Sequence, residues 1–337
     1  GERDIVMQAK QYSLVADVGG TNARFALVAD GDKTLIEPRN LAVADYPDIV
    51  HAIHAYLELA GLGQPWQAAI SVASPVTGDQ LHMTNHTWSF SVRETRAALG
   101  LRHLKVMNDY TALALALPAF TESQCRRVGG GEALAGYPMA VIGPGTGLGV
   151  SGAVHAGKHW IPLEGEGGHV SYGPVNAREM QIIERLRESH EHVSAELLVS
   201  GSGLALIYEM ICRIERGEAI KLRPGEVSSL ALEGGDNLAT EALEIFCGIL
   251  GTVAGNLALT IGARGGIYIG GGIVPRFIDY FAASSFRGRF ERHGRMTAYL
   301  REIPTYVIDT AYPAFIGAMV ALDPVYENVG VVSHETR

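Results

Sequence analysis

The sequence predicts an α/β protein of two lobes, and three observations lead to this fold class. The chain has 337 residues, which is more than one hydrophobic core usually organises. Its 41 glycines are clustered at the ends of apolar segments, where the backbone needs positive φ or must approach a ligand closely. The pattern of strand, glycine turn and strand occurs in both halves of the chain, which indicates two related lobes.

The composition narrows the class of protein. Apolar residues make up 47% of the chain and charged residues 19%, which is typical of a globular protein. A formal charge of −9 argues against a general nucleic-acid surface but allows a local nucleotide site. The sequence has no evident apolar run of membrane-spanning length, and the N-terminus lacks the apolar stretch of a signal peptide. We therefore expect a cytoplasmic protein that binds neither membrane nor nucleic acid.

Cysteine usage argues against a metal or disulfide framework. The three cysteines, Cys125, Cys212 and Cys247, are far apart and show no paired spacing. Cys212 and Cys247 lie in apolar helical patterns, where a free cysteine acts as a small core residue. We expect neither structural zinc nor a disulfide.

The first half of the chain reads as one α/β lobe. Strands are expected at residues 12–17, 23–29, 67–73 and 104–107. Helices are expected at residues 91–100 and 110–117. The first of these helices closes on Gly100 as a C-cap, and the second is stopped by Pro118.

The second half opens a similar set of elements. Strands are expected at residues 139–142, 148–155, 159–163 and 266–269. A capping-box start at Asn176 predicts a helix through His190 with Met180, Ile183 and Leu186 on one face. A second apolar stripe is formed by Leu204, Ile207, Ile211 and Ile214. Residues 240–261 are apolar nearly all round, which predicts a helix buried between layers.

The segment DVGGTNARF, residues 17–25, joins two strands. It cannot be a Walker loop, because that loop needs a Lys-Ser/Thr pair opening a helix. The N–H groups of Gly19, Gly20 and Thr21 could bind phosphate as a nest, with Asp17 holding magnesium through water. The alternative is a tight hairpin in which Asp17 and Asn22 satisfy local backbone groups.

Two further glycine segments follow. GPGTGLG, residues 143–149, joins two strands and does not match G-x-G-x-x-G, so a dinucleotide fold is disfavoured. Thr146 could donate its hydroxyl to a phosphate oxygen, and four glycines at a spacing of two favour a binding loop over a plain turn. GGIYIGGGIVPRF, residues 265–277, could receive an adenine, although βα turns in general are rich in glycine.

Two phosphate-binding hairpins and a downstream adenosine segment, in this order, resemble the actin–Hsp70–hexokinase superfamily of ATPases. Within it the chain resembles the bacterial glucokinase family from about Leu14 to about Ala318. The stretches that carry the resemblance are TNHTW (84–88), NDYTA (108–112), GTGLGV (145–150), EGEGGHV (164–170), HVSAE (192–196) and GGGIVPRF (270–277). The resemblance implies a two-lobe actin-like fold with ribonuclease-H-like sheets and an interlobe cleft.

The resemblance also implies an organisation and an activity. We expect a discontinuous small lobe at residues 11–118 plus 310–330 and a large lobe at residues 119–309. The implied activity is ATP-dependent phosphorylation of glucose at the C6 hydroxyl, with Mg²⁺ as the metal. Glucose and ATP are the implied partners, and the implied assembly is a homodimer.

Site residues follow from the matching motifs. Asp109 matches the catalytic base, and Asn108 is a sugar-binding neighbour. Glu166 and His169 match the pair that grips sugar hydroxyls, and Glu196 matches a glutamate near the anomeric end. The residues implied for the nucleotide and its phosphates are Asp17, Gly19, Gly20, Thr21, Asn22, Gly145, Thr146, Gly147, Gly271 and Gly272, with Asp17 also reaching Mg²⁺ through water. Arg24 occupies a matching position without an assigned contact.

The chemistry agrees with these roles, but structural alternatives stand beside them. A neutral hexose needs paired donors and acceptors, and phosphoryl transfer needs a group to receive the hydroxyl proton. Asp109 could instead be the N-cap of the helix that follows it. His169 could be a hydrogen-bonded structural histidine and Glu196 a solvated carboxylate, and Asn85 could fix a loop.

Three rival functions remain at this stage. The chain could phosphorylate mannose, fructose or an N-acetylhexosamine. A nucleotide-driven binding protein like actin would share the hairpins but lack the sugar-gripping set. A sugar sensor without activity is disfavoured by the intact Asp109. The related repressor/open-reading-frame/kinase family carries a zinc-binding cysteine cluster after its E-x-G-H motif, and this chain has no cysteine between Cys125 and Cys212.

Overall fold

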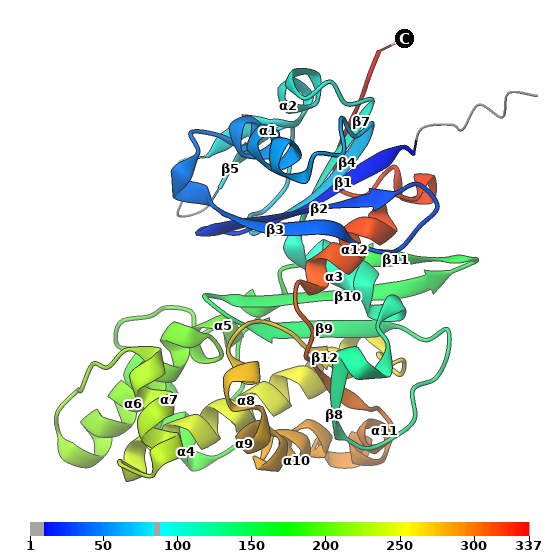
Figure 1. The fold of residues 1–337 in the computed structure, drawn as a ribbon. Coiled ribbons are helices and arrows are strands. Elements are labelled where there is room, and N and C mark those ends of the chain that lie inside the picture. The colour runs from blue at the N-terminus through cyan, green and yellow to red at the C-terminus, as the bar shows by residue number, and fades with distance from the viewer. Residues whose placement is uncertain (1–9, 84–87, 337) are drawn as a thin grey trace, which may run out of the picture. The chain divides into compact units, whose positions relative to one another are not determined.

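The computed structural model describes residues 10–83 and 88–336, so most of TNHTW, including Asn85, lies outside the described residues. The described chain divides into two compact units (Figure 1). The first unit runs to Ala119 and resumes at Tyr312, and the second spans Phe120–Ala311. Both are α/β.

The sheet of the first unit has six strands in the order β14-β7-β4-β1-β2-β3. Their bounds are β1 Tyr12–Val18, β2 Asn22–Ala29, β3 Ile36–Ala42, β4 Gln67–Val72, β7 His103–Asn108 and β14 Val331–His334. Strands β1, β2 and β3 form an antiparallel meander, whereas β4 and β7 continue parallel to β1. A separate hairpin pairs β5 (Gln80–His82) with β6 (Ser89–Ser91).

Helices cover both faces of this sheet (Figure 1). The helices are α1 Ile49–Ala60, α2 Val92–Ala98, α3 Asp109–Ala116 and α12 Pro313–Ala321. Leu14, Ala16 and Val18 of β1 pack with α1, and Val15 packs with α3 and α12. Because both faces are covered, Leu14, Val15 and Ala16 are apolar in succession instead of alternating with polar residues.

The sheet of the second unit repeats this pattern of pairings. Its order is β11-β10-β9-β12-β13-β8. The bounds are β8 Cys125–Gly129, β9 Met139–Pro144, β10 Leu148–Ala156, β11 His159–Leu163, β12 Ile267–Ile269 and β13 Thr305–Ile308. An antiparallel meander, β9 to β11, is again followed by two parallel strands, β12 and β13, and by an antiparallel edge strand.

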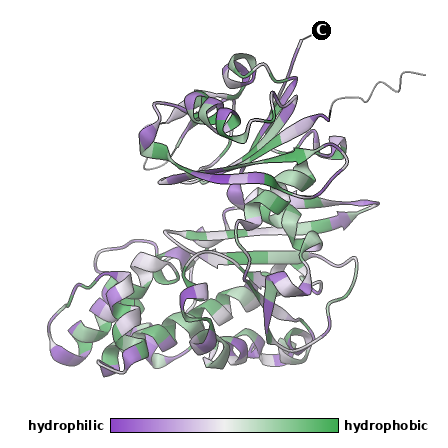
Figure 2. Cartoon of the chain, viewed as in Figure 1, coloured by the Kyte–Doolittle hydropathy of each residue, from purple (hydrophilic) through white to green (hydrophobic). Residues whose placement is uncertain are grey.

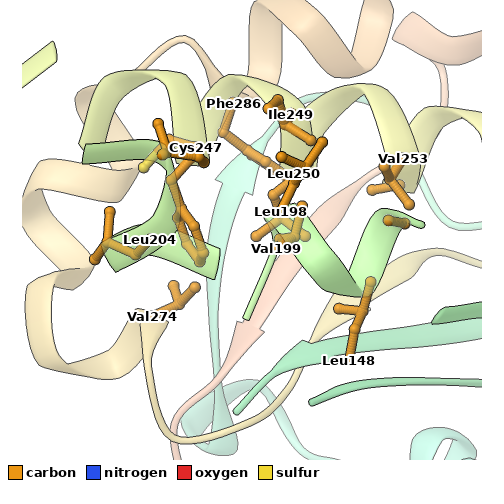
Figure 3. Packing of buried hydrophobic residues seen from close by; sticks show 14 of the residues in the cluster. Leu148, Leu198, Val199, Leu204, Cys247, Ile249, Leu250, Val253, Val274 and Phe286 are labelled. Atoms are coloured by element: carbon orange, nitrogen blue, oxygen red, sulfur yellow. The ribbon is translucent and has the colours of Figure 1, made fainter. Parts of the chain in front are cut away.

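The second unit holds most of the helices. They are α4 Ala177–Leu186, α5 Ala195–Leu198, α6 Gly201–Arg216, α7 Pro224–Glu233, α8 Asn237–Ile261, α9 Ile278–Ala283, α10 Phe286–Glu291 and α11 Thr297–Arg301. The longest, α8, begins at the Asp236 cap and ends at Gly262, whose φ is +66°. Most of α8 is hydrophobic, and its side chains pack against those of α5 and α10 (Figures 2 and 3).

Helix α8 corrects one expectation from the sequence. By length and composition it could cross a membrane, although no membrane-length run was expected. However, 72% of its most apolar window is buried inside the unit, which is what the core helix of a globular unit requires.

Helix α4 differs from the helix expected at residues 176–190. It begins at the predicted cap, Asn176, but ends at Leu186 and not at His190. Met180 is 55% exposed, whereas Ile182 is buried. The reason is Glu179, which turns inward to form a buried ion pair with Arg289 at 2.8 Å and rotates the predicted apolar face.

Candidate active site

The junction of β7 and α3 presents Asp109. Asn108, in extended conformation, is the N-cap of α3: its Oδ1 accepts from the Tyr110 N–H at 3.0 Å. Its Nδ2 donates to the Ser74 carbonyl at 2.9 Å. The alternative in which Asp109 is the N-cap is therefore wrong, because Asp109 is the first residue of the helix and its neighbour makes the cap.

Asp17, near the end of β1, and Asp109, directly after β7, lie at the same edge of the first sheet. The parallel strands β1, β4 and β7 end side by side, so residues at their carboxyl ends meet there. Burial, and after it the charge of Asp17, raise the pKa of Asp109 to about 7. Burial also raises the pKa of Asp17. The Arg24 guanidinium at 3.7 Å and the Ser71 hydroxyl at 3.4 Å lower it, but burial has the larger effect.

Arg24 now has a place that the sequence did not assign. It is the cross-strand partner of Asp17 on β2, and its guanidinium lies 4.8 Å from the Tyr312 ring centroid. Its Nε is buried without a hydrogen-bond partner among the described residues. Arg24 therefore supplies the positive charge that borders this edge of the sheet.

The first glycine turn is open. The Gly19 N–H donates to the Asn22 carbonyl at 2.9 Å, and the Thr21 carbonyl accepts from Val43 at 3.0 Å. A Cβ added to Gly20 would meet no described atom within 4 Å. These backbone bonds fix the turn, while Gly20 and Thr21 remain exposed to solvent.

The second glycine turn is enclosed by other glycines. The Gly145 N–H donates to Gly147, and the Gly145 carbonyl accepts from the Gly201 N–H at 2.8 Å. Gly271 has a φ of +80°, and its added Cβ would lie 2.2 Å from the Pro144 carbonyl oxygen. Because β12 runs parallel to β9, the residues after these two strands meet at one edge. Gly272 is open, and Thr146 is exposed.

The segment of residues 166–169 packs on β10 through Gly167 and Gly168. An added Cβ would lie 2.7 Å from the Val150 side chain at Gly167 and 2.2 Å from the Leu148 carbonyl oxygen at Gly168. This close approach places Glu166 and His169 beside the second turn, and both side chains are exposed. The two glycines are needed for the contact with β10.

Glu196 connects the segment of residues 166–169 to the second glycine turn. Its Oε1 accepts from the Leu148 N–H at 2.9 Å, and its Oε2 lies 3.7 Å from His169 Nε2. The short helix α5 that carries it is held by Leu198, which packs in the core beside Leu250 of α8 (Figure 3). The alternative of a merely solvated carboxylate is therefore wrong, because the side chain binds the chain's own backbone.

The structure thus assembles two groups of the expected residues, one in each unit. The first unit gathers Asp17, Gly19, Gly20, Thr21, Asn22, Asn108 and Asp109. The second gathers Gly145, Thr146, Gly147, Glu166, His169, Glu196, Gly271 and Gly272. Sequence reasoning missed Ser71, Ser74 and Gly201, which touch these residues. No sequence signal marked the two serines, whereas Gly201 opens a helix behind a serine cap.

The neighbouring carboxyl groups of Asp17 and Asp109 fit a magnesium site. Residues 10–83 and 88–336 contain no group of three or more His, Cys, Asp or Glu side chains arranged for a metal. Magnesium does not need such a cage, because it keeps several waters and takes one or two carboxylates together with phosphate oxygens. Asp17, buried beside the Asp109 carboxylate, offers a carboxylate oxygen of the type that Mg²⁺ prefers.

Comparison with known proteins gives one consistent family. The glucokinase family model matches residues 14–325. A glucokinase of Aromatoleum aromaticum is 48% identical over 311 residues, which cover 92% of this chain and 94% of that protein. A glucokinase crystal structure from an Antarctic psychrotroph has a TM-score of 0.86 and 36% identity, covering 93% of this chain and 98% of that one.

A more distant structure shares the fold. It is a glucokinase of Streptomyces griseus in complex with glucose and AMPPNP, with a TM-score of 0.59 and 19% identity, and the match covers 91% of this chain and 97% of that one. The two-lobe actin-like fold expected from the sequence is confirmed by these neighbours.

Proposed function

The chain belongs to the glucokinase family, and we propose that Asp109 is the general base with which it phosphorylates glucose. The enzyme is an ATP-dependent hexose kinase that transfers a phosphoryl group to glucose, as predicted from the sequence. The acceptor we propose is the C6 hydroxyl, with glucose 6-phosphate as the product.

The position and pKa of Asp109 carry this proposal. Its carboxyl lies at the start of α3, Asn108 makes the helix cap in its place, and its pKa is raised to about 7. A base whose pKa is close to the working pH best combines the ionised state with the ability to take a proton. Asp109 would orient the sugar hydroxyl and receive its proton as the phosphoryl group arrives.

The second unit supplies the sugar-gripping residues of the proposal. Glu166, His169 and Glu196 offer carboxylate acceptors and an imidazole to hydroxyl groups. Asn108 adds an amide. Among the described residues it bonds to Tyr110 and Ser74, which leaves one lone pair and one N–H for a sugar hydroxyl. The Glu196 carboxylate would hold its sugar hydroxyl while bound to Leu148.

ATP is the phosphoryl donor, and the two glycine turns are proposed to bind its phosphates through backbone N–H groups. Gly271 and Gly272 are proposed to line the adenosine site. Asp17 would hold Mg²⁺ through water, and that cation neutralises phosphate charge when bound. We also propose a cytoplasmic homodimer, which sedimentation of the purified chain tests.

An ADP-release assay tests the reaction. We expect turnover with Mg-ATP and glucose that exceeds turnover with mannose, fructose or N-acetylglucosamine, and that stops when EDTA removes the metal. Preference for another of these sugars would make the chain a kinase for that hexose. Sugar-independent ATP hydrolysis, or binding without turnover on any sugar, would contradict the proposal.

A further inference from the structure

A buried lysine that the proposed reaction does not use lies on the strand that leads to Asp109. Lys105 of β7 is 8% exposed. Its ammonium donates to the Ala321 carbonyl at the end of α12, at 2.8 Å, and to the Tyr326 carbonyl. Tyr326 belongs to the C-terminal tail, residues 322–336. A buried ammonium is retained only where its donors find acceptors, so Lys105 ties the tail to β7.

The rest of the tail runs along the same strand. In β14, Val332 is paired with Lys105 and His334 with His103, antiparallel to β7. Gly330 leads into β14 with a φ of +73°, and an added Cβ there would lie 2.3 Å from the Val106 carbonyl oxygen. Strand β4 pairs with one side of β7, and the tail covers the other side, which would otherwise be an open sheet edge.

The helix before the tail packs on the helix that Asp109 begins. A Cβ on Gly317 of α12 would lie 1.6 Å from the Ala112 carbonyl oxygen of α3, so the two backbones are in direct contact. Lys105 bonds the last residue of α12 as well as the tail. Asp109 thus lies at the junction of a strand and a helix that are both held by the same C-terminal segment.

We propose that the C-terminal tail is a clamp that positions Asp109, with Lys105 as its latch. Lys105 and the tail are positioning elements, because they reach the reaction only through β7 and α3. The inference rests on the proposed function of Asp109. Releasing the clamp lowers kcat by a larger factor than it raises the KM for glucose. Glu166, His169 and Glu196 belong to the second unit and keep their contacts, whereas of the proposed sugar-binding residues only Asn108 moves with Asp109.

Strand complementation tests the clamp. A chain ending at Asp323 is assayed alone and with a synthetic peptide of residues 324–337. We expect kcat to fall about 10- to 100-fold, as for a base displaced by roughly 1 Å. The peptide should restore kcat in a saturable way, as an added edge strand does, and a scrambled peptide should not. Full kcat in the truncated chain, or peptide binding without recovery, would overturn the inference.

If the truncated chain does not fold, a matched pair of point variants tests whether the tail positions Asp109. Gly330→Ala and Gly31→Ala both place a side chain at positive φ in the first unit, at +73° and +78°, but only the former meets β7. We expect Gly330→Ala to lower kcat by a larger factor than it raises the glucose KM, and Gly31→Ala to cost only stability. Equal kcat values, measured well below both melting temperatures, would refute the clamp.

Variants of the latch give a separate readout. Lys105→Met removes both donated bonds, whereas Lys105→Arg keeps the donors. Lower kcat in Lys105→Met with partial recovery in Lys105→Arg supports the latch, and identical kcat in both variants and the unchanged chain refutes it. If the unchanged chain shows no glucose-dependent ADP release, the proposed function fails; if it is active and every variant matches it, only the clamp fails.

Discussion

The glycine turn between β1 and β2 and the one between β9 and β10 hold equivalent places in their sheets, yet their surroundings differ. The first is bordered by a charged cross-strand pair, Asp17 and Arg24. The corresponding pairs of the second are neutral, and its nearby carboxylate arrives from Glu196, far along the chain. The charged side chains next to the first turn therefore come from the strands that the turn connects. The charged side chain next to the second turn comes from a segment 48 residues further along the chain.

Packing around the two turns differs as well. A Cβ on Gly20 would meet nothing within 4 Å, whereas a Cβ on Gly147 would lie 2.4 Å from Glu196 Oε1. Glycine leaves the first turn accessible and lets the second turn be surrounded. The two turns should therefore respond differently to substitutions of the same kind.

The largest effect is expected where the first unit loses its proposed base, Asp109. Asp109→Asn should lower kcat by roughly 10²- to 10⁴-fold, the usual contribution of a positioned general base. Steady-state kinetics with glucose and Mg-ATP measure it, with Asp32→Asn on the surface as the control. Unchanged kcat in purified Asp109→Asn would remove Asp109 from the mechanism.

The same variant should not lose stability. Because the folded pKa of Asp109 is raised to about 7, the ionised form is disfavoured by folding. The contribution of this group to stability is present below its unfolded pKa and lost as pH rises through about 7. Asp109→Asn should therefore melt at the same or a higher temperature than the unchanged chain at pH 8, and a lower melting temperature would contradict this electrostatic account.

A second substitution tests the packing of the enclosed turn. Gly271→Ala places a side chain at a φ of +80° against the Pro144 carbonyl and should cost roughly 2 to 4 kcal/mol of unfolding free energy. Gly20→Ala, in the open turn, should change it by about 0.5 kcal/mol or less. Urea unfolding of both variants measures the difference, and similar losses would end the contrast between the turns.

A third substitution tests the link between the second turn and Glu196. Gly147→Ala should displace the Glu196 carboxylate and raise the KM for glucose about tenfold, the worth of one hydrogen bond to a charged group. Gly173→Ala, whose Cβ would meet nothing within 4 Å, is the control. An unchanged glucose KM in Gly147→Ala would show that the second glycine turn does not affect the proposed sugar-binding residues.

The smallest effect near neutral pH comes from the titration of Asp109. In the proposed mechanism the ionised Asp109 carboxyl is the active form, so kcat/KM should be about half its plateau at pH near 7 and fall about tenfold per pH unit below that. A pH profile from 5 to 9 measures it. A flat profile down to pH 5 would indicate that Asp109 keeps an ordinary pKa in the free enzyme.

Much of this protein followed from the sequence. The strands at residues 12–17, 67–73 and 139–142, the long buried helix and its end at Gly262 are confirmed. Apolar runs that end in glycine determine such elements locally, because a buried strand or helix must be apolar and its turn must adopt positive φ. The motifs identified the family for the same reason: their residues are contiguous.

The tertiary structure decided what contiguous residues cannot. Asn108, and not Asp109, caps α3 because the Ser74 carbonyl, from the segment after β4, orients its amide. Glu179 faces inward because Arg289, 110 residues later, neutralises it. The tail lies on β7 because a buried lysine needs acceptors there. Each result depends on a partner brought close only by folding, and no local pattern in the sequence records such a partner.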